Sequence, residues 1–339
     1  MPTNLPSQLR IVGIRTAFEQ LFRPANELQD WNKISAFDSV VEQNSRYDVP
    51  LDVPLMEAWA GQNRYSGVNR LFVDYKIGKY QNGIQWTIDE DVYNKSQFNI
   101  LAQAQQLATQ ASNLPKYLAE EMLEGTAGSA GGRYYKGYNG VIPAAYDGNG
   151  IIYNSTRAGV TAGNKISGSG TTTDAIITDI KSVLAVFHEM ENEVNARKYW
   201  EGASSYKLIC IVPPEIIPYF TEVMTQKMAY AYATSAVTDK SYAYAAPYEN
   251  VWGSFIEIIP FGGLSDSNDW YAVMSSPEYP QRKPFLTLQL SGMEDYQLRY
   301  FNETTDKIND EKEIRQISVK RRLTVVPLDF HSIIEVENS

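Results

Sequence analysis

Acidic side chains are the main groups in this sequence whose type and spacing could carry chemistry. Asp89-Glu90-Asp91 and the pair Glu120-Glu121 place carboxylates side by side, as general acid–base hydrolysis or binding of a hard cation would need. The chain has two histidines, His188 and His331, which we interpret as structural or exposed, and one cysteine, so a metal site would depend on carboxylates alone. A solvated acidic face is the simpler explanation of such runs.

Glycine-rich segments do not complete a nucleotide-binding or metal-binding motif. Residues 125–132 and 168–170 lack the lysine and the strand context of a phosphate-binding loop. Asp147-Gly-Asn-Gly150 resembles half of a calcium loop, but the closing glutamate is missing and a turn is favoured. The chain also has no nucleophile elbow and no dinucleotide fingerprint. We therefore expect no catalytic residue, no cofactor, no metal ion and no enzymatic activity.

Composition restricts the remaining function classes. The 339 residues are 43% hydrophobic, which is enough for one large or two ordinary folded domains. The formal net charge of −10 argues against wrapping nucleic acid. No apolar run reaches 18 residues, and the N-terminus does not resemble a secretory signal, so we expect cytoplasmic synthesis and no membrane span. The 23 tyrosines favour large protein–protein contact surfaces, which are part apolar and part wet.

Residues 71–88 carry the strongest local signal, an alternation of apolar and polar side chains. Asn82-Gly83 in the middle tolerates positive φ, so the pattern predicts a long β-hairpin that turns there. Isolated two-stranded ribbons are marginal in water, so this one should lie on another surface, such as a neighbouring copy. The candidate contact residues between subunits are Tyr75, Lys76, Lys79, Asn82, Gly83 and Trp86.

Apolar residues spaced three and four apart from Phe98 to Met122 predict an amphipathic helix of about 28 residues. Pro115 should kink or break it near Asn113, and Gly125 should end it. A second unit is expected from about Thr173, with Asp174 as a helix N-cap and Cys210 in a buried strand. Further predicted elements are a helix at 9–22, a helix opened by Pro213-Pro214, and strands at 208–212, 252–259, 270–274, 285–290, 296–301, 314–326 and 333–336. The basic run 320–322 is interpreted as a solvated strand edge.

Together these elements predict an α+β fold, and their order resembles a phage major capsid protein of the Hong Kong 97 type. The sequence is similar in particular to the Mu-like major head subunit family. The resemblance covers nearly the whole chain and depends on order and spacing, since no single motif is diagnostic. The matching segments are Met56–Trp59, Tyr75–Gly78, Trp86–Asp91, Leu118–Gly125, Tyr138–Gly140, Tyr146–Gly148, Lys283–Gln289 and Arg321–Pro327.

The resemblance implies a domain organisation and a set of partners. Residues 1–63 would form an N-terminal arm, 64–90 an extended hairpin loop over an adjacent subunit, 91–150 with 284–339 a peripheral domain with the spine helix, and 151–283 an axial domain. Pentamers and hexamers of the chain would assemble into an icosahedral head shell of a tailed phage or prophage, made in the host bacterial cytoplasm. The shell would enclose double-stranded DNA without sequence-specific binding, alongside portal and decoration proteins.

The sequence departs from some relatives in its N-terminal region. Only about 60 residues precede the predicted hairpin, without a long charged helical segment, which implies a separate scaffold or none. Lys76 and Lys79 would allow the lysine–asparagine cross-link of some relatives, although a solvated hairpin also explains them. Two alternatives remain: an encapsulin-type compartment shell, and a hydrolase or glycan-binding protein that uses Asp89, Glu90 and Glu120.

Overall fold

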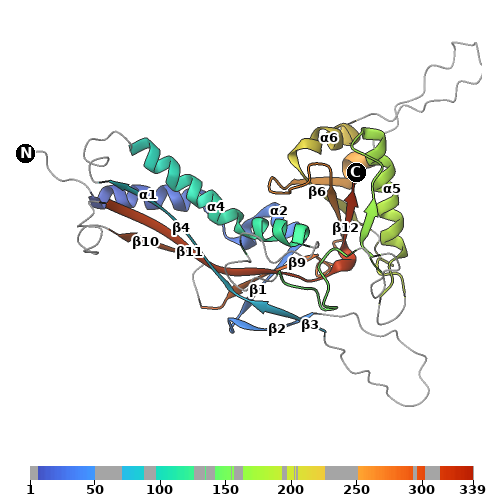
Figure 1. Cartoon of the computed structure of the whole chain (residues 1–339), viewed down its shortest axis with the longest axis horizontal. Coiled ribbons are helices and arrows are strands. Elements are labelled where there is room, and N and C mark those ends of the chain that lie inside the picture. Colours follow the sequence, from blue (N-terminus) through green and yellow to red (C-terminus); the bar gives the residue numbers. More distant parts are fainter. Residues whose placement is uncertain are drawn as a thin grey trace, which may run out of the picture. The chain divides into compact units, whose positions relative to one another are not determined.

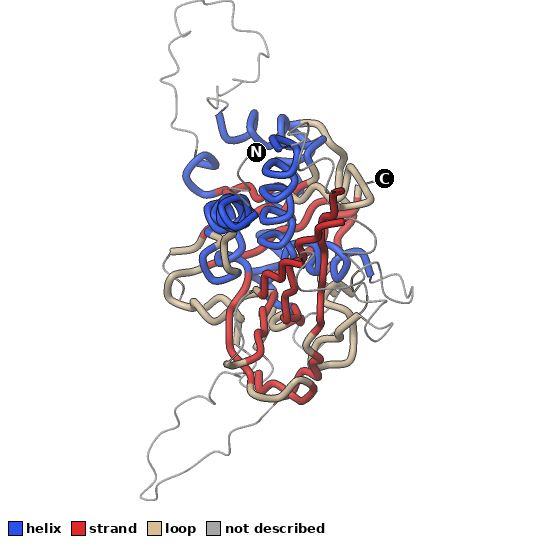
Figure 2. The backbone as a smooth tube through the Cα atoms, turned by 90° about the vertical axis from the view of Figure 1, so that its left-hand side faces the viewer, coloured by secondary structure: helices blue, strands red, loops and turns tan. Residues whose placement is uncertain are grey.

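The computed structural model describes residues 7–49, 71–87, 97–125, 134, 142–153, 155, 163–192, 197–201, 203, 205–225, 251–292, 296–301 and 314–338. The fold mixes helices and strands, which confirms the predicted α+β class (Figures 1 and 2). The chain divides into two compact units. Unit 1 comprises Met1–Val49, Leu71–Gly150 and Phe285–Leu328, and unit 2 comprises Pro50–Arg70, Ile151–Pro284 and Asp329–Ser339.

Unit 1 is built on a sheet of five described strands, whose centre is the long strand β11 (Ile314–Pro327). β4 (Gly78–Thr87) runs antiparallel along one edge of β11, from Ile314↔Thr87 to Leu323↔Gly78. Along the other edge lie β9 (Phe285–Leu290) and then β10 (Gln297–Phe301), both antiparallel to β11. β1 (Ser35–Val40) adds a parallel strand to β9. Most of these pairings join segments distant in sequence, so local pattern alone does not specify them.

The predicted hairpin with a turn at Asn82-Gly83 is wrong. β3 (Leu71–Lys76) pairs with β2 (Asn44–Val49), while Asn82 and Gly83 lie inside β4. The alternation correctly predicts strands on both sides of residue 77, but β3 and β4 belong to different sheets. Gly83 does not form a turn. It allows β4 to lie close to β11, since a Cβ at this position would lie 2.7 Å from the Ile317 carbonyl oxygen. Residues 64–70 and 88–90 of the predicted extended loop lie outside the described residues.

This close approach gives a first test. Gly83→Ala should force β4 away from β11, and overpacking of this kind costs about 1–3 kcal/mol of folding free energy. Gly262→Ala is the matched control, because nothing lies within 4 Å of a Cβ at that position. Urea unfolding of both variants measures the difference. Equal stability of the two would contradict the assigned packing of β4 on β11.

Two helices cover one face of the unit 1 sheet: α1 (Ser7–Leu21) and α4 (Gln97–Glu124), the predicted long helix (Figure 1). Odd-numbered residues of β11 point toward them, and Val319 and Ile317 pack in their apolar clusters. The clusters contain Phe18, Phe22, Leu107, Ala108, Ala111 and Val319, and next to them Ile14, Trp86, Ile100, Ala104 and Ile317. On the same side of β9, α2 (Gln29–Ile34) places Trp31, whose Nε1 donates a 2.8 Å hydrogen bond to Thr287 Oγ1.

The predicted break of the long helix at Pro115 is also wrong. α4 continues through Pro115 and ends at Glu124, next to the expected stop at Gly125. Proline lacks the N–H that would bond the carbonyl four residues earlier, here that of Ala111. Arg321 of β11 donates a hydrogen bond from Nη1 to this carbonyl oxygen. A side chain from the sheet thus replaces the missing helix donor.

The opposite face of the sheet is covered at one end by the ribbon, our name for the β2–β3 pair. The inward side chains of the ribbon, Val49, Val73 and Tyr75, pack on Leu286, Leu288 and Val326 of the sheet. The ribbon lies below the strands in Figure 1, on the side away from α1 and α4. An apolar inner side and a mainly polar outer side, on which Phe72 is the exposed apolar residue, allow the ribbon to be stable on its own chain.

Unit 2 holds a second sheet of five described strands, in the order β5-β12-β8-β6-β7. Their bounds are Lys165–Ser167, Ile333–Glu337, Trp270–Ser275, Lys207–Val212 and Ile256–Pro260. The sheet packs with α5 (Thr173–Glu189) and α6 (Ile217–Thr225), while α7 (Val251–Phe255) occupies the start of the strand predicted at 252–259. Short 3-10 turns are Ala25–Glu27, Pro214–Ile216 and Phe330–Ser332.

Two predictions for unit 2, the N-cap of α5 and the placement of residues 329–338, are corrected, and the burial of Cys210 is confirmed. Thr172, not Asp174, caps α5, because its side chain accepts from the Ala175 N–H. Residues 329–338 belong here and not with 284–328, since β12 pairs with β8. Cys210 is fully buried in β6 as expected, and burial raises the pKa of its thiol.

Candidate functional site

Two of the six predicted contact residues are internal packing residues of unit 1. Tyr75 is 5% exposed on the inner side of the ribbon, and its hydroxyl donates to the Glu42 carbonyl oxygen at 3.2 Å. Desolvation by burial raises the pKa of Tyr75. Trp86 is 6% exposed and packs with Ile14 and Ile317. Their side chains therefore contribute to the core of one subunit.

The other predicted contact residues lie closer to the surface. Lys79, Asn82 and Gly83 are exposed on β4, and Lys76 is partly exposed at the end of β3. Asn82 Nδ2 donates to Gln110 Oε1 of α4 at 2.8 Å, and Asn82 Oδ1 accepts from the Gly83 N–H at 2.8 Å. The amide of Asn82 thus ties the strand to the helix. These four residues remain candidates for contacts between copies.

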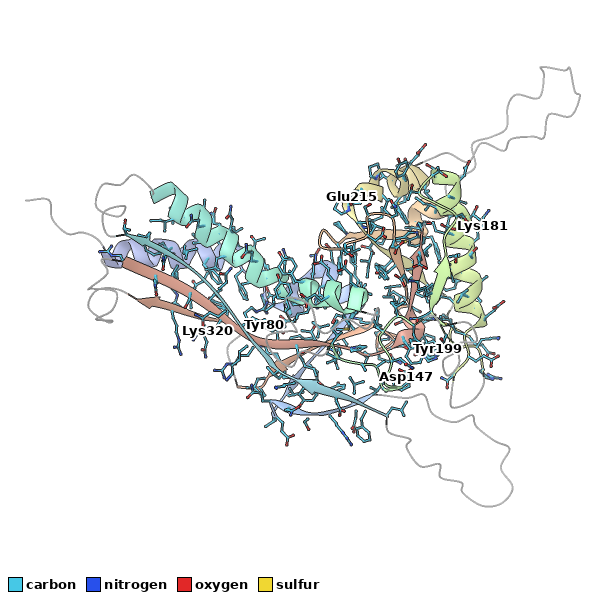
Figure 3. The ribbon with its side chains drawn as sticks, in the orientation of Figure 1. Tyr80, Asp147, Lys181, Tyr199, Glu215 and Lys320 are labelled. Atoms are coloured by element: carbon cyan, nitrogen blue, oxygen red, sulfur yellow. The ribbon has the colours of Figure 1, made fainter. Side chains whose placement is uncertain are left out.

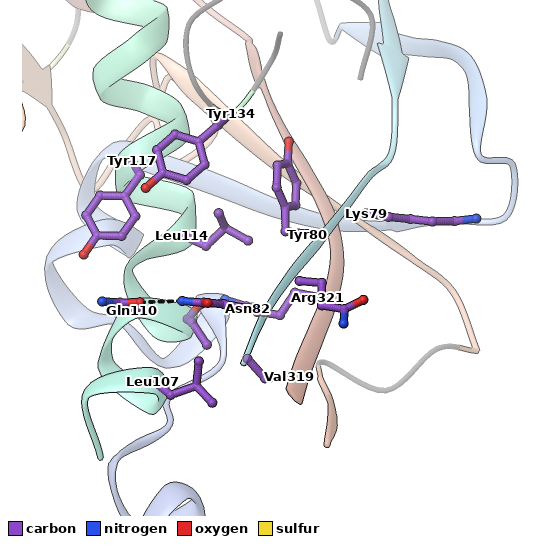
Figure 4. A pocket seen from close by; sticks show the side chains of 12 residues that line it. Lys79, Tyr80, Asn82, Leu107, Gln110, Leu114, Tyr117, Tyr134, Val319 and Arg321 are labelled. Carbon is purple, nitrogen blue, oxygen red and sulfur yellow. Dashed lines mark hydrogen bonds between the residues drawn. The ribbon is translucent and has the colours of Figure 1, made fainter. Parts of the chain in front are cut away.

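A cavity of about 580 Å³ opens between α4 and β4, on the helix side of the unit 1 sheet (Figure 4). Tyr117 and Tyr134 stack with ring centroids 5.7 Å apart, and the Tyr134 N–H donates to the Glu121 carboxylate at 2.7 Å. None of the described lining residues is a carboxylate, histidine or cysteine, and the titratable side chains of the lining are lysine, tyrosine and arginine. The lining is Lys79, Tyr80, Gln81, Asn82, Leu107, Gln110, Ala111, Leu114, Tyr117, Tyr134, Val319 and Arg321.

The face of β4, β11 and β10 that points away from α4 carries cations; we call it the basic face. Its charged members are Lys79, Arg299, Lys320 and Arg322, and Lys320 is labelled on this side in Figure 3. None of the described residues of this face is acidic. The other members with described side chains are Gln81, Gly83, Gln85, Thr87, Gln297, Gln316 and Ser318.

The prediction that 320–322 is a solvated edge is wrong for its central member. Arg321 is 2% exposed and points toward α4, where its guanidinium lies 5.2 Å from the centre of the Phe22 ring. Lys320 and Arg322 alternate with it on the basic face and are partly exposed. β11 is a central strand, so its period-2 alternation divides the run between a buried and an open side.

The candidate catalytic carboxylates do not form a described site. Asp89 and Glu90 lie outside the described residues, and Glu120 is 8% exposed within α4. Among the described residues, no group of three His, Cys, Asp or Glu side chains could hold a metal ion. Asp147 forms the expected turn, accepting from the Asn149 N–H at 3.1 Å, with Gly148 at φ 81°.

The two histidines have the structural and exposed positions expected of them. His331 is 3% exposed in unit 2, where its ring stacks on Tyr199 with centroids 4.6 Å apart. The Tyr199 hydroxyl donates to Asp329 at 2.9 Å, and the Arg282 guanidinium covers the Tyr199 ring at 4.1 Å. His188 is exposed on α5 beside Tyr206. The contacts of Tyr199 therefore hold together three segments of unit 2, around residues 199, 282 and 329–331.

An ion-pair group lies at the β5–β12 edge of unit 2. Lys165 Nζ lies 3.2 Å from Glu335 Oε2 and 2.9 Å from Glu337 Oε1. Burial raises the pKa of Glu335, and the Lys165 charge partly opposes this shift. The positions of these groups in paired strands explain the contact: Glu335 and Lys165 are direct partners in the parallel register.

Several solved structures are similar to this chain over nearly its whole length, at low sequence identity. A virus-like particle protein from Pyrococcus furiosus is 12% identical, with a TM-score of 0.48 and coverage of 98% of this chain and 99% of that one. The capsid protein of cyanophage P-SCSP1u is 12% identical, with a TM-score of 0.48 and coverage of 94% and 89%. The SrpI encapsulin of Synechococcus elongatus is 10% identical, with a TM-score of 0.45 and coverage of 95% and 94%.

No family model and no curated protein matches the sequence. Within the described residues, none of the helices has the length and apolar character needed to cross a bilayer.

Proposed function

We propose that this chain is the major capsid protein of a phage head, a non-enzymatic subunit with the Hong Kong 97-type fold. The observation that carries the proposal is the order of its elements. An N-terminal helix and a two-stranded ribbon precede a 28-residue helix laid along a sheet, and the chain returns to that sheet after building a separate unit. In this proposal α4 is the spine helix, unit 1 the peripheral domain and unit 2 the axial domain.

In this proposal the ribbon is the base of the extended loop that reaches an adjacent subunit. β2 and β3 pair from Asn44↔Lys76 to Val49↔Leu71, so their far ends lie side by side. This replaces the predicted loop at 64–90, of which the part in β4 belongs to the central sheet. The outward side of the ribbon, with Arg46, Phe72 and Asp74 exposed, would be available to a neighbouring copy in this proposal.

Pentamers and hexamers would assemble into a shell of a Mu-like tailed phage, with scaffold, portal and decoration proteins as further partners. The virion would be the location of the chain, and the enclosed DNA would be held without sequence-specific contacts. Many weak contacts between identical copies add up to a stable lattice by avidity. The second candidate with the same fold is an encapsulin-type compartment, which differs in its contents.

Expression of the whole chain in bacteria tests the proposal. We expect a fast-eluting species whose light-scattering mass is many times that of the monomer, with closed shells, tubes or capsomers in negative-stain images. Nuclease-protected DNA in shells made with the phage packaging proteins would favour the head, and a co-purified enzyme would favour the compartment. A chain that stays monomeric when concentrated, and when co-expressed with its neighbouring structural genes, would exclude both.

A further inference from the structure

The cavity between α4 and β4 has the size of a small-molecule site. Its volume of about 580 Å³ lies within the range of about 300–1,000 Å³ that is usual for such sites. All of its described lining residues belong to unit 1, so its walls come from one compact unit of one chain. We therefore asked which chemistry the lining would recognise.

Three tyrosine rings lie at one end of the cavity (Figure 4). The rings of Tyr117 on α4 and Tyr134 stack with 12° between their planes and 5.7 Å between their centroids. The ring of Tyr80 on β4 is tilted by 60° to that of Tyr134, at 6.5 Å. Aromatic rings attract other flat rings through offset stacking and edge-to-face contact. This end of the cavity thus favours a flat aromatic group.

Contacts on the protein side hold two of these rings in place. The Tyr80 ring lies against the backbone of Gly78, where an added Cβ would overlap the ring. The backbone N–H of Tyr134 donates to both carboxylate oxygens of Glu121, at 2.7 and 2.9 Å. The rings are therefore oriented by the fold, as the side chains of a largely pre-formed ligand site are.

The other end of the cavity supplies a polar group. Asn82 Nδ2 donates one N–H to Gln110 Oε1 at 2.8 Å, which fixes the amide between strand and helix (Figure 4). An amide nitrogen has two N–H groups, and within the described part of the chain no residue accepts the second one. The lining between the two ends includes the buried apolar side chains Leu107, Leu114 and Val319.

We propose that this cavity binds a flat, uncharged aromatic molecule that carries a hydrogen-bond acceptor. Its ring would lie against Tyr80 and Tyr117, and its acceptor would take the second N–H of Asn82. The Arg321 guanidinium, which also lines the cavity, is engaged with the Ala111 carbonyl and the Phe22 ring, so the proposal assigns no ligand group to it. The proposal concerns unit 1 alone and does not depend on the assignment of the chain as a shell subunit.

Coumarin is the probe, because it is flat, aromatic and uncharged and carries a lactone carbonyl as acceptor. Octahydrocoumarin is the matched ligand, since it has the same lactone on saturated rings. The protein variants are Tyr117→Leu, which removes the ring, and Tyr117→Phe, which keeps it. Tyr219→Leu makes the same change at a tyrosine that is 41% exposed on α6 of unit 2 and is the control. Saturation-transfer difference NMR on the whole chain measures each dissociation constant, and circular dichroism melting checks that each variant is folded.

We expect coumarin to bind the wild type with a dissociation constant of about 0.1–1 mM, as a ligand of this size allows. Tyr117→Leu should weaken binding about three- to tenfold, the loss expected for one ring–ring contact. Tyr117→Phe and Tyr219→Leu should change it by less than about twofold. Octahydrocoumarin should bind the wild type more weakly than coumarin does, and this difference should shrink in Tyr117→Leu.

Three outcomes would overturn the proposal. The first is no saturation transfer to coumarin at about 5 mM, well above the expected dissociation constant. The second is equal binding by wild type and a folded Tyr117→Leu variant, or equal weakening in Tyr219→Leu, because the probe would then bind elsewhere. The third is equal affinity for coumarin and octahydrocoumarin, which would exclude an aromatic ligand class. The shell assignment is tested separately, by the light-scattering mass.

Discussion

Replacing Arg321 by methionine is expected to destabilise unit 1 by about 2–3 kcal/mol, a large fraction of a typical domain stability. Methionine keeps the length and apolar stem of the side chain, so the core beside Phe22 stays filled. It removes the donor that satisfies the Ala111 carbonyl, which Pro115 leaves without its helix partner. Loss of a charged donor to a buried acceptor costs more than loss of an exposed hydrogen bond.

A double-mutant cycle with Pro115→Ala separates this role from simple packing. Alanine at position 115 restores the helix N–H, so the Ala111 carbonyl would have a partner with or without Arg321. The cost of Arg321→Met should then fall by about 1–2 kcal/mol relative to its cost beside Pro115. Urea unfolding of the unassembled chain, followed by tryptophan fluorescence, gives the four free energies.

The control for this cycle is Arg15→Met, which removes an arginine from an exposed position on α1. Its side chain is 68% exposed and forms a surface ion pair with Glu19, so the expected change is within about 0.5 kcal/mol. If Arg321→Met costs the same with proline and with alanine at 115, the arginine acts through its contact with Phe22. The helix would then tolerate Pro115 without help from the sheet.

The elements that sequence predicts well are those whose signal is contained in one segment. The four-and-three spacing of Leu107, Ala111 and Leu114 matches the buried side of α4. The continuous apolar run around Cys210 matches a strand buried on both faces. Strands β8 to β12 also lie at the predicted positions within about one residue. The signal of each is a run rich in apolar and β-branched or aromatic residues within one short segment.

Errors arise where the decisive partner is far away in sequence. Asn82-Gly83 is a strong turn signal, but β11 supplies a ten-residue partner that keeps both residues in strand. Pro115 is a strong helix breaker, but Arg321, 206 positions later, supplies the missing donor. Arg321 also lies between Lys320 and Arg322, whose side chains point to the opposite face of the sheet. The number of basic residues in the run does not reveal this division. Local propensity gives way in each case to packing across the sheet.

Asn164→Asp is expected to destabilise unit 2 by about 4 kcal/mol at neutral pH, and Asn164→Ala by about 3 kcal/mol. The side chain of Asn164 is fully buried and bonds four backbone groups. Nδ2 lies 2.7 Å from the Ile151 carbonyl oxygen and 3.1 Å from that of Ile333, with Phe330 at 3.4 Å, while Oδ1 accepts from the Tyr153 N–H at 2.8 Å. One amide thus joins the loop at 151–153 to the entry of β12.

The two substitutions fail for different reasons, and pH distinguishes them. Alanine leaves the carbonyls and the Tyr153 N–H without the side chain at every pH. A carboxylate in the same place would direct negative charge at three carbonyl oxygens in a buried site, so its pKa would be raised above that of an exposed aspartate. A raised folded-state pKa means that stability is recovered as pH falls, because the protonated acid can again donate one hydrogen bond.

Urea unfolding of unit 2 at neutral pH and at about pH 5 therefore gives a specific pattern. The deficit of Asn164→Asp relative to wild type should shrink at the lower pH, while that of Asn164→Ala should stay constant. Asn268→Asp, at an exposed position in unit 2, is the control and should change little at either pH. A pH-independent deficit in Asn164→Asp would mean that the site relaxes to admit water, and that the amide does not hold β12 to the loop.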